Sequence, residues 1–199
     1  KQLVSSFSHE LKTPLHAIVA ASELLQTCDK NTRRELLETI LYSGRDLLEL
    51  VNDLLDFSEL RSGDLRLVNK IFNLPENVKA TVNSIKHLAT AKNLKLITIL
   101  SQDLPKYVIG DFRRIKQIIL NFISNAIKYT DSGTVTLKVE SKNHKDGYSD
   151  LTFSVKDTGC GISQEDFPKL FQRFIQLNST KPGTGLGLAI CKELATLMK

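Results

Sequence analysis

A run of apolar and small residues near the start of the chain, spaced alternately four and three positions apart, constrains the fold more than any other feature. The run comprises Val4, Ser8, Leu11, Leu15, Ile18, Ser22 and Leu25. This spacing predicts the seam of a helix, over about residues 1–28, that packs against other helices. It places His9 off the seam and next to Glu10. An imidazole held outward on a helix is accessible, and near physiological pH much of it is neutral and nucleophilic.

The simplest interpretation of His9 alone is a surface histidine on an amphipathic helix. His16, one heptad later, offers an internal comparison: it also faces outward, but no Thr-Pro pair follows it. Pro14 lacks an N–H group and its ring crowds the carbonyl of Glu10, at a local cost of about 3 kcal/mol. Strain of this size beside His9 favours a functional site over a passive helix.

A second long helix follows a turn near Asp29 and ends at Ser62-Gly63. Its apolar positions are Leu36, Leu37, Ile40, Leu41, Leu47, Leu48, Val51, Leu54, Leu55 and Leu60. The two helices predict a hairpin whose apolar faces are too wide for one pair to cover. We therefore expect two copies to form a four-helix bundle, and hence a homodimer.

Composition excludes few classes of protein. The 199 residues are 41% hydrophobic and carry a formal net charge of +5, which suits anionic partners such as nucleotides. Three cysteines without paired or metal-ligand spacing indicate a reducing compartment. No apolar run is long enough for a transmembrane helix and no signal peptide is evident, so we expect a soluble, cytoplasmic segment of a longer protein, compatible with a membrane anchor elsewhere in that protein.

The pattern changes after Gly63, which predicts two domains, residues 1–62 and 63–199. In the second domain the pattern predicts strands over 65–74, 94–100, 134–141 and 151–156, with a polar loop over 142–150. It predicts helices from Pro75 to about Lys92 and from 110–111 through Tyr129, with helix and glycine-rich loop in the remainder. Strands and helices are mixed without regular alternation, which favours an α+β sandwich, a sheet with helices on one face.

Three clusters in this domain suit a nucleotide. Asn121 and Asn125 project from one helix face, with Lys128 within one turn, and can offer an amide oxygen to Mg²⁺ and an ammonium to phosphate. For this trio alone a polar helix face is the favoured interpretation. Asp157 follows a strand and precedes Gly159 and Gly161, so that a carboxylate can accept from an exocyclic amine beside a closely approaching backbone. A simple strand-to-helix turn is an equal alternative.

The third cluster is the run 183–188, Gly-Thr-Gly-Leu-Gly-Leu, which opens the last helix. Backbone N–H groups at a helix N-terminus suit a polyphosphate, although the run is not a Walker A loop. Before it, Phe171 and Phe174 precede a polar stretch, 176–182, that could move as a lid over nucleotide.

The motif order His-Glu-x-x-Thr-Pro, Asn-x-x-x-Asn-x-x-Lys, Asp-x-Gly-x-Gly, Phe-x-x-Phe and Gly-Thr-Gly-Leu-Gly-Leu resembles the sensor histidine kinases of two-component systems. Each string is weak alone, but the set in this order is specific. Residues 1–62 resemble the dimerisation and histidine-phosphotransfer domain, and 63–199 the Bergerat-type ATP-binding domain. The sequence around His9 is similar to the sequences of the hybrid subgroup, whose members carry their own receiver domain.

The resemblance implies a role for each matching residue. His9 is the phospho-acceptor, Glu10 the acid that orients and deprotonates it, and Thr13 positions water when the partner is dephosphorylated. Asn125 ligates Mg²⁺ with support from Asn121, and the remaining expected ATP contacts are Lys128, Tyr129, Asp157, Gly159, Gly161, Thr184, Gly185, Leu186 and Gly187. Phe171 and Phe174 couple the lid to the bundle. The implied cofactors are ATP and Mg²⁺, and the implied partners are a second copy and a response-regulator receiver domain, with no nucleic acid.

Two departures from the family pattern leave alternatives open. The segment between Phe174 and Gly183 is shorter than the usual lid, and the chain stops at Lys199, before the strands that usually complete the sheet. The short lid favours an inactive dimeric scaffold, whereas intact Asn125, Lys128 and Asp157 argue against it. An ATPase like a chaperone or topoisomerase module is a third interpretation, disfavoured by the preceding Ser-His-Glu helix.

Overall fold

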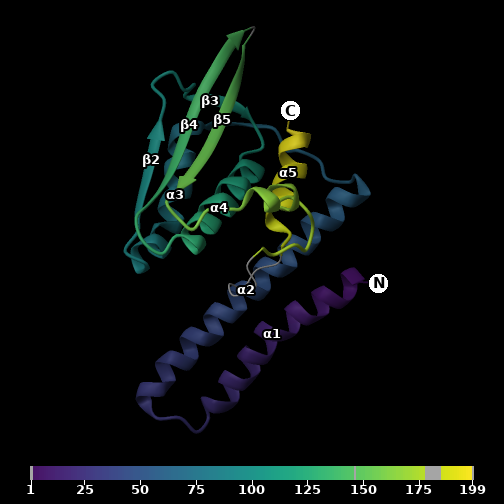
Figure 1. Cartoon of the computed structure of the whole chain (residues 1–199), viewed down its shortest axis with the longest axis vertical. Helices are drawn as coiled ribbons and strands as arrows, with labels where there is room; N and C mark the ends of the chain where they lie inside the picture. The colour runs from purple at the N-terminus through teal and green to yellow at the C-terminus, as the bar shows by residue number, and fades with distance from the viewer. Residues whose placement is uncertain (1, 146, 178–184, 199) are drawn as a thin grey trace. The chain divides into compact units, whose positions relative to one another are not determined.

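The computed structural model describes residues 2–145, 147–177 and 185–198, with side chains except those of 2–9, 30, 31, 49 and 143–145. The chain divides into two compact units, Lys1–Leu65 and Arg66–Lys199. Each unit is described by itself below, and Figure 1 shows the order of the elements. Among the described helices, none combines the length and apolarity needed to cross a membrane.

The first unit is the predicted helical hairpin, made of α1 (Gln2–Leu24) and α2 (Lys30–Ser62). Helix α1 runs without interruption through Pro14 and ends at Leu24 rather than near residue 28. The Asp29 side chain caps α2 by accepting the Thr32 N–H at 2.8 Å. Gly63, at φ 75°, ends α2 in the left-handed conformation that glycine adopts most readily.

Few apolar residues of the hairpin are buried. Pro14 and Ala21 are buried on α1, and Leu50 and Phe57 are buried on α2. Seam residue Leu15 remains 48% exposed, because with a single partner helix each helix buries only one stripe. Large apolar side chains are exposed on both helices: Leu15, Val19, Leu24, Leu37, Leu41, Tyr42, Leu48, Val51 and Leu55. The hairpin therefore carries a broad uncovered apolar surface.

The second unit begins with β1 (Lys70–Asn73), α3 (Leu74–Ala91), β2 (Lys95–Leu100) and β3 (Tyr107–Gly110). It continues with α4 (Phe112–Tyr129), β4 (Thr134–Lys145) and β5 (Tyr148–Asp157), and ends with the short 3-10 helix η1 (Gln164–Lys169) and α5 (Gly187–Leu197). The main sheet has the order β2-β4-β5, with β2 parallel and β5 antiparallel to β4. Strands β1 and β3 form a separate antiparallel pair.

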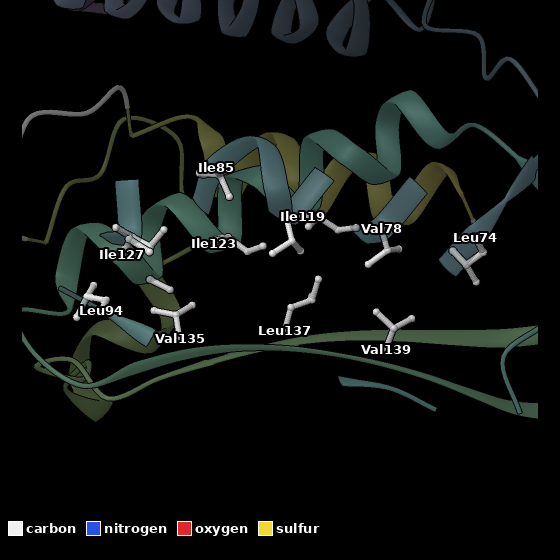
Figure 2. Close-up of a cluster of buried hydrophobic side chains, with 13 residues drawn as sticks. Leu74, Val78, Ile85, Leu94, Ile119, Ile123, Ile127, Val135, Leu137 and Val139 are labelled. Atoms are coloured by element: carbon white, nitrogen blue, oxygen red, sulfur yellow. The ribbon is translucent and has the colours of Figure 1, made fainter. Parts of the chain in front are cut away.

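The core of this unit lies between the main sheet and the helices on one of its faces (Figure 2). Alternate residues of β4, namely Val135, Leu137 and Val139, are fully buried and point toward the helices. Helices α3 and α4 supply the other side, chiefly Leu74, Val78, Ile85, Ile119, Ile123 and Ile127. The predicted fold class, a helical hairpin followed by a sheet with helices on one face, is confirmed.

Two of the predicted strand assignments were wrong in extent. The strand expected over 65–74 is limited to Lys70–Asn73, because its partner β3 offers only four residues and the Val68 N–H bonds to the Asp111 carboxylate instead. Strand β3 itself was not predicted. The polar loop expected over 142–150 is mostly strand, since β4 and β5 continue pairing past a bulge to Lys145 and Tyr148.

Candidate functional site

Helix α4 presents two asparagines and a lysine on one face. Asn121, Asn125 and Lys128 are half-buried, whereas the opposite face buries Ile123 and Ile127 in the core. The Asn125 Nδ2 donates to Asn121 Oδ1 at 3.0 Å. This hydrogen bond fixes one amide against the other and leaves Asn125 Oδ1 as the acceptor of that side chain. An amide oxygen is a suitable ligand for a hard cation, so the residues present fit Mg²⁺.

The N-terminus of α5 lies next to this face. A methyl group in place of the Gly187 hydrogen would overlap the Asn121 amide, so glycine is required for this close approach. The first backbone N–H groups of a helix lack intrahelical partners and carry partial positive charge. The amides of α4 therefore neighbour a helix N-terminus whose free N–H groups could bind an anion, an arrangement that suits a polyphosphate.

The Asp157 carboxylate stands at the end of β5 and is exposed. Its Oδ1 accepts the Gly159 N–H at 2.8 Å, which fixes the carboxylate plane. Its Oδ2 accepts no hydrogen bond from the described residues. A ligand amine can therefore bind this second oxygen.

The turn after Asp157 packs on the end of α4. A Cβ atom at Gly159 would come within 2.5 Å of the Tyr129 carbonyl oxygen, which also accepts the Cys160 N–H at 3.5 Å. Lys128 Nζ lies 5.1 Å from the centroid of the Tyr129 ring. Gly161 has φ 72°, a conformation that favours glycine. The asparagine motif of α4 and the Asp-x-Gly-x-Gly motif thus lie on adjoining elements.

The two ends of the segment 175–184 are joined by a backbone hydrogen bond. The Phe174 N–H donates to the Gly185 carbonyl at 2.9 Å, and both residues have positive φ, 64° and 63°. A side chain at Gly185 would lie 2.8 Å from the Phe174 carbonyl carbon. The two residues that border the candidate lid segment are therefore held next to each other.

Phe171 and the nearby Arg173 contact side chains of α5. Lys192 Nζ lies 5.9 Å from the centroid of the Phe171 ring, which is 43% exposed. Arg173 pairs with Glu193 at 3.3 Å.

In η1, hydrogen bonds from Lys169 and then Ser163 hold the pKa of Asp166 below its ordinary value.

Some predicted residues are described only in part. The backbone of His9 lies in α1, but its side chain is outside the described part of the chain, and Thr184 is outside it altogether. Glu10 is half-buried and Thr13 is exposed on the same helix. Leu186 is fully buried, so only its backbone is available to a ligand.

Two residues that no motif included support the site. Lys92 Nζ donates to the carbonyls of Ile127, Lys128 and Thr130 at 2.8, 3.1 and 3.1 Å, and so caps the end of α4. The Thr158 hydroxyl joins the Asp157 turn to the loop before β4. The sequence carries no signal for Lys92, because its partners are more than thirty residues away.

The comparisons with known proteins agree with this geometry. Residues 1–63 match the family model of the His Kinase A (phospho-acceptor) domain. Residues 110–199 match the model of the histidine kinase-, DNA gyrase B- and HSP90-like ATPases. The predicted resemblance to histidine kinases is confirmed.

Individual relatives span the whole chain. Hybrid signal transduction histidine kinase B of Dictyostelium discoideum is 36% identical over 98% of this chain, which covers 10% of that protein. The crystal structure of full-length ShkA in complex with AMPPNP is 30% identical, with a TM-score of 0.71 over 99% of this chain and 41% of that one. The Acinetobacter baumannii histidine kinase AdeS is 26% identical, with a TM-score of 0.68 over 94% of this chain and 86% of that one.

The chain spans only a small part of its curated relative, but both family models and these structural neighbours agree. The chain therefore belongs to the histidine kinase family, as a phospho-acceptor domain followed by an ATPase domain.

Proposed function

We propose that this chain is the core of a protein-histidine kinase that transfers the γ-phosphoryl group of ATP to His9 and then to an aspartate of a response-regulator receiver domain. One observation carries this proposal: α4, the Asp157 turn and the α5 N-terminus form one site that suits a nucleotide, in a chain that also carries a phospho-acceptor domain. Phosphoryl transfer needs mainly positioning and charge neutralisation, which such a site supplies.

The nucleotide is held at both of its ends. Asp157 Oδ2 accepts a hydrogen bond from the adenine amine, beside the backbone of Gly159 and Gly161. The phosphates lie at the α5 N-terminus near Gly185 and Gly187, with Lys128 as a further cation. Asn125 would ligate Mg²⁺, and the ion would supply positive charge beside the phosphate oxygens. The AMPPNP complex of ShkA, a relative with 30% identity, supports a triphosphate in such a site.

In the transfer step an imidazole nitrogen of His9 attacks the γ-phosphorus. The new N–P bond forms as the bond to the β,γ-bridging oxygen breaks, and ADP leaves with that electron pair. Glu10 orients the ring and accepts its proton. In the second step a receiver aspartate takes the phosphoryl group and His9 is regenerated. Thr13 positions the water that hydrolyses the aspartyl phosphate when the enzyme acts as a phosphatase.

Transfer joins two compact units. His9 belongs to the first unit and the nucleotide site to the second. A movement of the linker that follows Ser62 therefore brings the γ-phosphate to His9. Phe171 and Phe174, which precede the candidate lid, are the residues that we expect to transmit nucleotide binding to the bundle.

The hairpin acts as a dimer. Its exposed leucines and valines would be covered in a four-helix bundle formed with a second copy. A dimeric bundle presents two phospho-acceptor histidines, one from each copy.

The second candidate function is an inactive dimeric scaffold, which the short segment between Phe174 and Gly183 favours. Calorimetric titration with ATP, with and without Mg²⁺, separates the two. A kinase binds ATP in a Mg²⁺-dependent manner, Asn125→Ala removes that dependence, and Asn83→Ala, on the exposed face of α3, leaves it intact. Absence of Mg²⁺-linked binding in the parent protein would support the scaffold. Label that moves from γ-labelled ATP to this chain, and then to an added receiver domain, would establish both transfer steps.

A further inference from the structure

The Thr158 hydroxyl makes hydrogen bonds on both sides of a turn that is far away in sequence. Its Oγ1 accepts the Thr134 N–H at 3.0 Å and donates to the Ser132 carbonyl at 3.2 Å, with the Thr134 carbonyl at 3.5 Å. Gly133, at φ 112°, lies between these partners, and a Cβ atom there would overlap this hydroxyl. The Thr158 side chain therefore packs closely against the loop of residues 132–134.

This contact begins where the sheet ends. The ladder between β4 and β5 ends at the pair Val135 and Asp157, so no further strand pairing holds the backbone beyond Asp157. The Thr158 side chain replaces the next pair by bonding to Thr134. On the other side, Gly159 packs against the Tyr129 carbonyl. The backbone that carries the Asp157 carboxylate is thus held between a ladder pair and a clamp formed by the Thr158 side chain.

We propose that Thr158 is a positioning residue that sets the base selectivity of the nucleotide site, in favour of purines with a 6-amino group over 6-oxo purines. The inference rests on the proposed function, in which Asp157 reads the adenine amine. Asp157 Oδ1 accepts the Gly159 N–H, which leaves Oδ2 without a hydrogen-bond partner among the described residues and available to a base amine. A 6-oxo group presents an oxygen to this carboxylate and is repelled, but only while the carboxylate cannot turn away.

The clamp acts on selectivity through the position of one carboxylate. Without the Thr158 hydroxyl the turn can shift relative to Thr134, and Asp157 can move away from a 6-oxo base. Contacts to the phosphates involve α4 and α5 and remain unchanged. Loss of the hydroxyl should therefore weaken ATP binding more than inosine triphosphate binding.

The test compares the affinities of ATP and inosine triphosphate by calorimetry in the parent chain and in Thr158→Val, Thr158→Ser and Thr152→Val. Thr152 is an exposed threonine of β5 and serves as the matched control. We expect the ratio of the two affinities to fall about tenfold in Thr158→Val, a change of about 1.4 kcal/mol. We expect it to be preserved in Thr158→Ser and Thr152→Val.

Equal weakening of both nucleotides in Thr158→Val would show a purely structural role and overturn the inference while the proposed function stands. A parent chain that binds neither nucleotide would overturn both. Because Thr158 is exposed, Thr158→Ala removes the hydroxyl without opening a cavity. It provides the same readout if the valine variant fails to fold.

Discussion

Gly187 lies so close to Asn121 that its missing side chain is a condition for the candidate magnesium site. The Asn121 amide in turn holds that of Asn125 through a 3.0 Å hydrogen bond. A methyl group at position 187 must displace Asn121 and, with it, the proposed metal ligand. A substitution in the last glycine motif should therefore change the position of the asparagines of α4.

We expect Gly187→Ala to weaken Mg²⁺-dependent ATP binding by tenfold or more, measured by calorimetry. Alanine is a better helix former than glycine, so the free energy of unfolding should change little. Gly44→Ala, in α2, is the matched control, because nothing lies within 4 Å of its new Cβ atom. Unchanged ATP affinity in Gly187→Ala would contradict the coupling.

Sequence motifs pointed to residues whose proposed chemistry is direct, but not to those that we propose act by positioning other groups. Asn125 and Asp157 could be predicted because amide and carboxylate oxygens at such spacings suit a cation and an amine. Thr158 and Lys92 could not, because their roles depend on contacts with loops and helix ends distant in sequence. Such contacts follow from the fold and leave no local pattern.

At the scale of elements, α4 depends on a residue of α3's C-terminal end. The Lys92 ammonium uses its three N–H donors on three carbonyls at the end of α4, where the helix dipole is negative. Lys128 and Tyr129 occupy that same end. The Lys92 cap should therefore both stabilise the second unit and hold Lys128 and Tyr129 in place at the candidate nucleotide site.

Replacing Lys92 with Met should lower the free energy of unfolding by about 1–2 kcal/mol, because three carbonyls lose a charged partner. Urea denaturation measures this change. Lys86 is an exposed lysine of α3, six residues before Lys92. Lys86→Met controls for loss of surface charge and should change stability by less than about 0.5 kcal/mol. Equal effects of the two substitutions would show that the cap contributes nothing.

Helices could be predicted more reliably than short strands. Long periodic runs and caps such as Asp29 and Gly63 placed α2, α3 and α4 within a few residues. Strand β3 was missed because it has only four residues, which alternate between exposed and half-buried, too short a run to show a period in the sequence. The strand hairpin was predicted too short because its outer part is polar.

At the scale of the whole molecule, the uncovered apolar stripe on α2 is the basis for the proposed dimer. Leu37, Leu41, Leu48 and Leu55 recur at helical spacing and are 52%, 55%, 62% and 57% exposed in the single hairpin. Exposed apolar patches of this kind mark interaction surfaces. Among the described residues of the hairpin, no contact covers these side chains further.

Leu41→Glu should convert the dimer into a monomer of about 22.3 kDa in sedimentation equilibrium, because a carboxylate cannot be buried unpaired in a bundle core. Ile97→Glu, on the outer face of the main sheet where Ile97 is 41% exposed, is the control and should leave the dimer intact. A Leu41→Glu protein that still sediments as a dimer would place the interface elsewhere.

We propose that His9 receives phosphate from a nucleotide bound in the second unit. The most direct measurement is incorporation of label from γ-labelled ATP into the parent chain, His9→Gln and His16→Gln, with ATP affinity measured in each. We expect acid-labile label on the parent chain and on His16→Gln, and none on His9→Gln despite unchanged ATP binding. Acid-labile label that persists on His9→Gln would contradict the claim.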